Sequence, residues 1–179
     1  IYLGGILFNP GYGLYKSTDG GENWFGFADT LNNNPINYFE DVTIIPNEPS
    51  GIIYVSSYYG VYRSTDSGVT WQSTNFSDPG ARNIGTNRNG YMFFGNPTAS
   101  WYGIYRSTDL GLTWLRHTLL SVELAMVYLR DGSVLAGCYD SGLGSSGIYK
   151  TTNNGDIWFN TNTFTGLNVA TDFLLDTND

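Results

Sequence analysis

Short runs of apolar and aromatic residues alternate along the chain with clusters of glycine, asparagine, serine and aspartate. The runs are rich in β-branched and aromatic residues, which favour strands, and the polar clusters between them are typical of turns. Glycine occurs 23 times and tyrosine 14 times in 179 residues, which strengthens the same interpretation. The pattern therefore predicts an all-β chain.

A twelve-residue pattern recurs four times in register. It begins with glycine, an apolar residue, tyrosine and a basic residue, and it closes on tryptophan, at 13–24, 60–71, 103–114 and 147–158. Successive closing tryptophans lie 47, 43 and 44 residues apart. A period of this length, with several short strands per unit, is typical of the four-stranded blades of a β-propeller. We expect residues 1–179 to form a single β-propeller, or part of one, with four repeats.

Each repeat divides into four expected antiparallel strands, A to D, from the innermost outwards. Strand A is expected at 41–46, 82–86, 124–129 and 170–175, and strand B at 1–5, 51–56, 91–95 and 133–138. Strand C carries the run from glycine to the basic residue, and strand D begins at each tryptophan. We expect strand 1–5 to pair with strand 170–175, within one chain or across a homodimer. Four blades closing alone and additional blades completing a larger propeller are both open.

Part of the repeat has a more specific pattern, Ser/Thr-x-Asp-x-Gly-x-x-Trp, at 17–24, 64–71, 107–114 and 151–158. This pattern resembles the Asp-box, or bacterial neuraminidase repeat, found in sialidases, xyloglucanases and sortilin-type receptors. The resemblance covers the whole chain at a regular interval and implies a β-propeller fold. It does not imply an activity, because enzymes and non-enzymes share the repeat.

We expect this box to have a structural role in the turn between strands C and D. The carboxylate and hydroxyl can bond backbone groups of the turn, glycine can supply a positive φ, and tryptophan can wedge between blades. Asn153 replaces the aspartate in the fourth box, so that turn is expected to be the weakest. The alternative is metal or substrate binding, but one carboxylate per turn is too few for calcium. The box residues are Ser17, Asp19, Gly21, Trp24, Ser64, Asp66, Gly68, Trp71, Ser107, Asp109, Gly111, Trp114, Thr151, Asn153, Gly155 and Trp158.

The two ends of the expected blades differ. A–B and C–D turns share one end, whereas the longer B–C and D–A loops share the other, where variable loops usually carry binding. Aromatic rings beside polar groups suit a carbohydrate, although the rings could instead pack inward and the acids could be solvated. The candidate ligand-binding residues at this long-loop end are Tyr58, Tyr59, Trp101, Tyr139, Glu40, Asp41, Arg82, Glu123 and Asp172.

Charge and composition exclude several function classes. A net charge of −8 disfavours nucleic-acid binding, and no apolar run approaches the ~18 residues of a membrane span. The single Cys138 and single His117 cannot form a disulfide or fill a zinc site, so we expect a buried thiol and no metal or cofactor. Sialidase chemistry, by family resemblance, needs three arginines around a carboxylate. Only Arg82 and Arg116 lie outside the repeats and the A–B turns, so that chemistry is disfavoured.

Two functions fit these observations. The first is a non-catalytic binding or scaffold module, secreted or on a bacterial surface, whose partner is a glycan or another extracellular protein. The alternative is a fragment of a glycoside hydrolase whose catalytic carboxylates lie partly outside this segment, since the acids near the innermost strands could serve as one of the pair.

Overall fold

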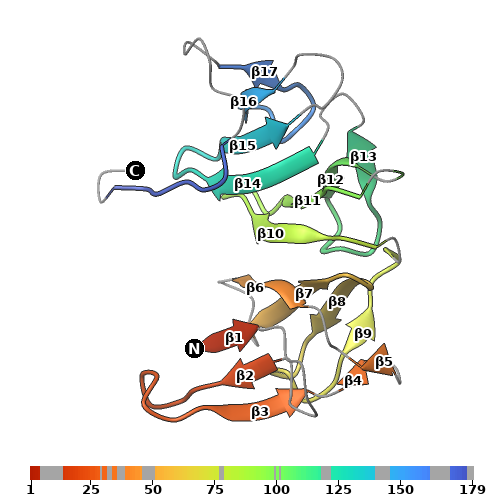
Figure 1. The fold of residues 1–179 in the computed structure, drawn as a ribbon, viewed down its shortest axis with the longest axis vertical. Coiled ribbons are helices and arrows are strands. Elements are labelled where there is room, and N and C mark those ends of the chain that lie inside the picture. Colours follow the sequence, from red (N-terminus) through yellow and green to blue (C-terminus); the bar gives the residue numbers. More distant parts are fainter. Residues whose placement is uncertain are drawn as a thin grey trace. The chain divides into compact units, whose positions relative to one another are not determined.

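The computed structural model describes residues 1–4, 14–28, 30–31, 34–35, 39–45, 51–76, 79–98, 100, 102–117, 122–139, 146–161 and 170–176. All the regular secondary structure assigned in these ranges consists of β-strands, so the prediction of an all-β chain is confirmed (Figure 1). The chain divides into two compact units, Ile1–Ile84 and Gly85–Asp179. Both units consist of antiparallel sheets whose strands follow one another in chain order.

The first unit contains three sheets (Figure 1). Strands β1 (Tyr2–Gly4), β2 (Leu14–Lys16) and β3 (Phe25–Ala28) form a three-stranded sheet. A small hairpin of β4 (Thr30–Leu31) and β5 (Asn34–Pro35) follows within the expected D–A loop. The third sheet has four strands, β6 (Phe39–Ile45), β7 (Ile52–Ser57), β8 (Gly60–Ser64) and β9 (Gln72–Ser73).

Two more four-stranded sheets follow. Strand β10 (Arg82–Thr86) includes the boundary between the units and continues into β11 (Met92–Asn96), β12 (Gly103–Ser107) and β13 (Leu115–His117). The last sheet consists of β14 (Val122–Tyr128), β15 (Val134–Tyr139), β16 (Gly147–Thr151) and β17 (Phe159–Asn160). The three four-stranded sheets have the expected order A to D, with strand bounds that differ by at most a few residues from those predicted.

The expected strand A at 170–175 is not formed as a strand. Residues 170–176 have no strand assignment, and Leu174 is almost fully exposed. Within the described residues, β1 pairs only with β2. A strand needs a partner for its backbone groups, and none is assigned to this segment. The pairing of residues 1–5 with 170–175 therefore stays a prediction.

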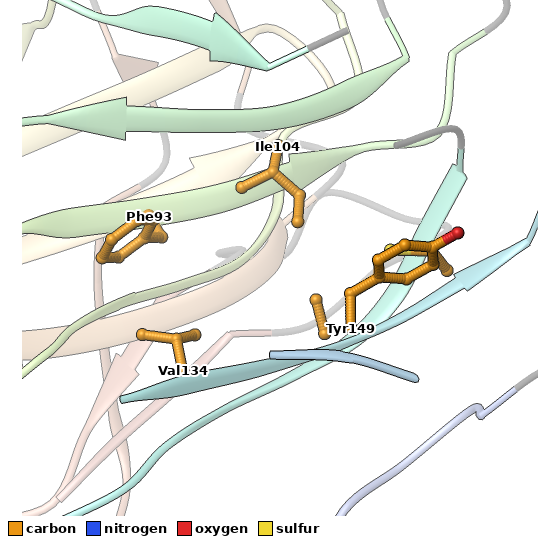
Figure 2. Close-up of a cluster of buried hydrophobic side chains, with 6 residues drawn as sticks. Phe93, Ile104, Val134 and Tyr149 are labelled. Atoms are coloured by element: carbon orange, nitrogen blue, oxygen red, sulfur yellow. The ribbon is translucent and has the colours of Figure 1, made fainter. Parts of the chain in front are cut away.

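Each unit has its own apolar core, supplied by alternate residues of neighbouring strands. In the first unit Leu14, Val55 and Tyr62 are buried together, and Val42 and Trp71 pack against them. In the second unit the residues that share a buried cluster are Phe93, Ile104, Val134, Ala136, Cys138 and Tyr149 (Figure 2). The buried position of Cys138, with 1% of its surface exposed, agrees with the expectation of a buried thiol.

The C–D turns all use a buried hydroxyl as an acceptor. In the second repeat the Gly68 N–H donates to Ser64 Oγ at 2.8 Å, and that hydroxyl donates to Asp66 Oδ1 at 2.8 Å. Ser17, Ser107 and Thr151 accept from the matching glycine N–H at 2.8, 2.8 and 2.9 Å. The four glycines have φ between 79° and 102°, a conformation that glycine adopts without strain. The turns therefore share one geometry.

The tryptophans of the repeats do not behave alike. Trp71 and Trp158 pack on the two cores, and the Trp114 ring meets Phe94 edge to face at 4.7 Å between centroids. Trp24 is 38% exposed, so the expectation that it wedges between sheets is wrong for this residue. Its indole N–H donates to the Gly21 carbonyl of its own turn at 3.0 Å, as the Trp71 indole does to Gly68 at 3.0 Å. The repeat sets the local turn, whereas ring burial depends on the neighbouring sheet.

We predict that Ser64→Ala destabilises the chain by about 1–3 kcal/mol, because the buried Gly68 N–H loses its acceptor. Asp66→Ala should cost less, since the carboxylate is exposed and its donors can turn to water. Urea unfolding of the two variants checks the order. A larger loss for Asp66→Ala would show that the carboxylate, rather than the hydroxyl, holds the turn.

A second prediction concerns acid unfolding. Hydrogen bonds from the Thr70 hydroxyl and N–H lower the pKa of Asp66 to about 2, below its value in the unfolded chain. The contribution of this carboxylate is therefore present above about pH 4 and is lost as the pH falls towards about 2. Asp66→Asn should show a smaller loss of stability across this window than the wild type. Thermal unfolding at pH 5 and pH 2.5 measures the loss of stability of each protein. If the wild type and Asp66→Asn lose the same stability between these pH values, the assignment is contradicted.

Candidate functional site

Several candidate residues gather at one end of the sheet β6–β9. Strand β7 ends at Ser57, the turn Tyr58–Tyr59 follows, and β8 starts at Gly60. The register pairs Phe39 with Ser57, so the first residues of β6 lie at the same end as this turn. We call Asp41, Ser56, Tyr58, Tyr59 and Arg82 the tyrosine end.

The two tyrosines form an exposed pair. Tyr58 is 47% and Tyr59 43% exposed, and their rings meet edge to face with centroids 5.5 Å apart. The turn beneath them is held on both sides. Ser57 Oγ accepts from the Tyr59 N–H at 3.0 Å and donates to the Gly60 carbonyl at 3.2 Å, and the Gly80 N–H donates to the Tyr58 carbonyl at 3.0 Å. The backbone that carries both rings is therefore fixed by hydrogen bonds.

Asp41 lies near the start of β6 and is partly buried. Its Oδ1 accepts from the Val42 N–H at 2.7 Å, and the Ile84 N–H also donates to this carboxylate. Burial raises the pKa of Asp41 to about 6, and the two N–H donors oppose that rise without cancelling it. The carboxyl group therefore changes its charge near pH 6.

Ser56 is the cross-strand neighbour of Asp41. The register pairs the two residues directly, and directly paired residues share one face of a sheet. The Ser56 side chain is completely buried, and its Oγ has no hydrogen-bond partner within the described residues. Ser56 is not among the candidate residues identified from the sequence. The signal that could have found it is a comparison of the repeats, which have glycine at the matching positions.

Glu40 and Arg82 belong to the same unit as the tyrosine end, whereas Glu123 and Asp172 belong to the second unit. Glu40 lies in β6, at an irregularity in the register between Phe39 and Asp41, and Arg82 begins β10. In the second unit Glu123 lies opposite Cys138 at the start of β14. Asp172 is exposed and accepts from the Phe173 N–H at 2.8 Å. Trp101 lies outside the described residues.

Tyr139 was expected in a B–C loop, and that placement is wrong. It is the last residue of β15 and pairs with Val122, because the strand extends one residue beyond its predicted end. Tyr102 also lies beside a B–C loop in the sequence, but it was not among the candidate ligand-binding residues. Tyr102 is 39% exposed, and the guanidinium of Arg116 lies 5.3 Å from its ring centroid. Tyr102 precedes the strand C glycine as Tyr59 does, so the repeated Tyr-Gly pair was the available signal.

Two kinds of site find no support in the part of the chain that the structure describes. No group of three or more His, Cys, Asp or Glu side chains there could hold a metal ion. In the same residues no helix is long and apolar enough to cross a membrane.

No protein-family model matches the chain, and no curated protein matches it. The fold is similar to that of an ancestral GH74 enzyme, with a TM-score of 0.65 and 19% identity over 84% of this chain and 21% of that one. It is also similar to the Niastella koreensis GH74 enzyme, with a TM-score of 0.55 and 20% identity over 83% and 22%. The Hadza microbial sialidase Hz136 matches with a TM-score of 0.48 and 16% identity over 81% and 35%.

The chain therefore has a propeller-type fold. It spans about a fifth of the length of the two GH74 enzymes. At this level of identity the likeness establishes the arrangement of strands, while activity depends on particular residues of a site.

We predict that Asp41→Asn stabilises the chain above pH 7. The pKa of Asp41 is raised in the folded chain, so its contribution to stability is greatest below about pH 4 and falls as the pH rises through about 6. An uncharged amide avoids the cost of holding an ionised carboxylate in a partly buried position. This cost amounts to about 1–3 kcal/mol for a pKa shift of this size. Thermal unfolding at pH 4 and pH 8 checks the result. A variant that is no more stable than the wild type at pH 8 would contradict the burial of this charge.

Proposed function

We propose that the chain forms part of a propeller that binds a glycan through the tyrosine end. The observation that carries this proposal is the exposed pair Tyr58 and Tyr59 on a turn fixed by hydrogen bonds. The C–H-rich face of a sugar ring packs on an aromatic ring, and the polar edge of the sugar needs hydrogen-bonding groups close by. Asp41 supplies a carboxylate at the same end.

The fixed backbone of this turn favours binding. A side chain that is already held in place loses little conformational entropy when a ligand arrives, so more of the contact energy appears as affinity. Exposed aromatic residues also dominate binding energy at many interfaces. The turn between β7 and β8 has both properties, since three hydrogen bonds hold its backbone and both rings reach the solvent.

The proposed role is non-catalytic, as a binding or scaffold module. We place it outside a bacterial cell, because lysine occurs only twice in a chain rich in asparagine, serine, threonine and glycine. Additional blades, from further sequence or from a second copy, complete the propeller in this proposal. An extracellular protein is the other partner that exposed tyrosines suit.

A glycoside hydrolase fragment is the second candidate. The specific observation in its favour is the partly buried carboxyl of Asp41, whose pKa of about 6 suits a proton donor near neutral pH. The likeness in fold to two GH74 enzymes is compatible with this candidate. Such a reaction needs a second carboxyl group, which the missing part of a larger propeller would supply.

The binding proposal is tested on an array of plant and bacterial glycans, followed by calorimetry with the best ligand. Tyr58→Ala and Tyr59→Ala should each weaken binding about tenfold or more, equivalent to about 1.4 kcal/mol, without lowering the melting temperature. Val69→Ala is the matched control, because Val69 is 80% exposed in the C–D turn at the other end of the same sheet. Equal effects of all three substitutions, or none from the tyrosines, would refute the proposal.

A reducing-sugar assay separates the two candidates. The binding module should release no new reducing ends from the polysaccharide that it binds. Release that disappears in Asp41→Asn would favour the hydrolase instead.

A further inference from the structure

One position of strand B distinguishes the second repeat from the others. In strand C of each repeat, an apolar residue follows the glycine. The position in question is the strand B residue that pairs with this apolar residue. Gly4 pairs with Leu14, Gly95 with Ile104 and Gly137 with Ile148, whereas in the second repeat Ser56 pairs with Val61. Three repeats therefore have glycine where the second has a hydroxyl side chain.

The structure explains the glycine in the fourth repeat. A Cβ added to Gly137 would lie 2.4 Å from the carbonyl oxygen and 2.8 Å from the Cβ of Ala170, so the chain passes too close for a side chain. Ser56 carries a side chain at the matching position of β7, and its Oγ is buried without a partner within the described residues. A buried hydroxyl without a partner costs stability, so the fold alone gives no reason for it.

The strand A residue that pairs with this strand B position is also polar in the second repeat and small in the fourth. Asp41 pairs with Ser56 in the second repeat, and Ala125 pairs with Gly137 in the fourth. Both pairs lie beside an irregularity of the register, between Phe39 and Asp41 in one sheet and between Glu123 and Ala125 in the other. The backbone is thus alike, while two small residues are replaced by a carboxyl and a hydroxyl on one face. Departures from a local pattern of this kind are expected at functional sites.

We infer that Asp41 determines the specificity of the tyrosine end for an uncharged, hydroxyl-rich ligand. This inference rests on the proposed function. The carboxylate, at the start of β6, accepts hydrogen bonds from ligand hydroxyl groups. A ligand that carries its own carboxylate is repelled, because two like charges in a partly buried site are poorly screened.

The ionisation of Asp41 then controls binding. Burial raises its pKa to about 6, so the strong acceptor is present above that pH and is lost below it. The other charged or titratable residues on this turn and on the strands around it are Glu40 on β6, Tyr54 on β7, Tyr58 and Tyr59 in the turn, Tyr62 and Arg63 on β8, Tyr2 on β1 and Arg82 on β10. Except for Glu40, these groups ordinarily titrate well above pH 6.5. They are therefore not expected to produce a transition near pH 6.

The test uses the whole chain and two probes of equal length, a neutral glucan oligosaccharide and an oligogalacturonide. Calorimetry at pH 4.5 and pH 7.5 should show that the wild type binds the glucan about tenfold more tightly at the higher pH. It should prefer the glucan to the galacturonide most strongly at pH 7.5. Asp41→Asn should bind the glucan with little dependence on pH and should lose most of this preference. Glu22→Gln, an exposed acid in a C–D turn, is the control that should behave as the wild type does.

An Asp41→Asn variant that keeps the wild-type pH profile would overturn the role of Asp41.

The outcomes also separate this inference from the proposed function. If Tyr58→Ala weakens glucan binding and Asp41→Asn does not alter the pH profile, the inference alone fails. If the wild type binds neither probe, or Tyr58→Ala binds the glucan as tightly as the wild type does, both fail.

Discussion

The hydrogen bond from a glycine N–H to a buried hydroxyl in each C–D turn is the interaction on which the rest of the structure depends. Ser17, Ser64, Ser107 and Thr151 each accept such a bond at 2.8–2.9 Å. The bond fixes the point at which strand C ends and strand D turns back. Because the same geometry recurs in all four turns, one end of each sheet is uniform and the connections at the other end can differ.

Much of the fold was predictable, because a repeat in register determines which residues belong to which strand. The run from glycine to the basic residue becomes β8, β12 and β16, and the bonds of Ser64 and Asp66 follow the expected pattern. Local chemistry sets these features, so the sequence contains them. The hairpin β4–β5 and the extension of β15 to Tyr139 were not predicted, since strand ends depend on pairing with a neighbour.

The candidate site was predictable only in part. Tyr58, Tyr59, Glu40 and Asp41 were selected for their place at the long-loop end, and the register brings them to one end of a single sheet. The exposure of Trp24 and the burial of Ser56 could not be predicted, because both depend on how closely the adjacent chain approaches. A comparison of the repeats would have identified Ser56, because the other repeats have glycine at the matching position. Where backbone geometry is shared, a residue that differs from its counterparts identifies a local requirement other than folding.

The two ends of the sheet β6–β9 have separate roles: the hydroxyl-bonded turn stabilises the fold, and the tyrosine end is proposed to bind the ligand. Amide hydrogen exchange, measured with and without a saturating neutral glucan oligosaccharide, tests this division most directly. We expect added protection in peptides that cover residues 39–45, 54–62 and 79–84, with no change at 64–71 or 107–114. Protection confined to the C–D turns, with none around Tyr58 and Asp41, would contradict it.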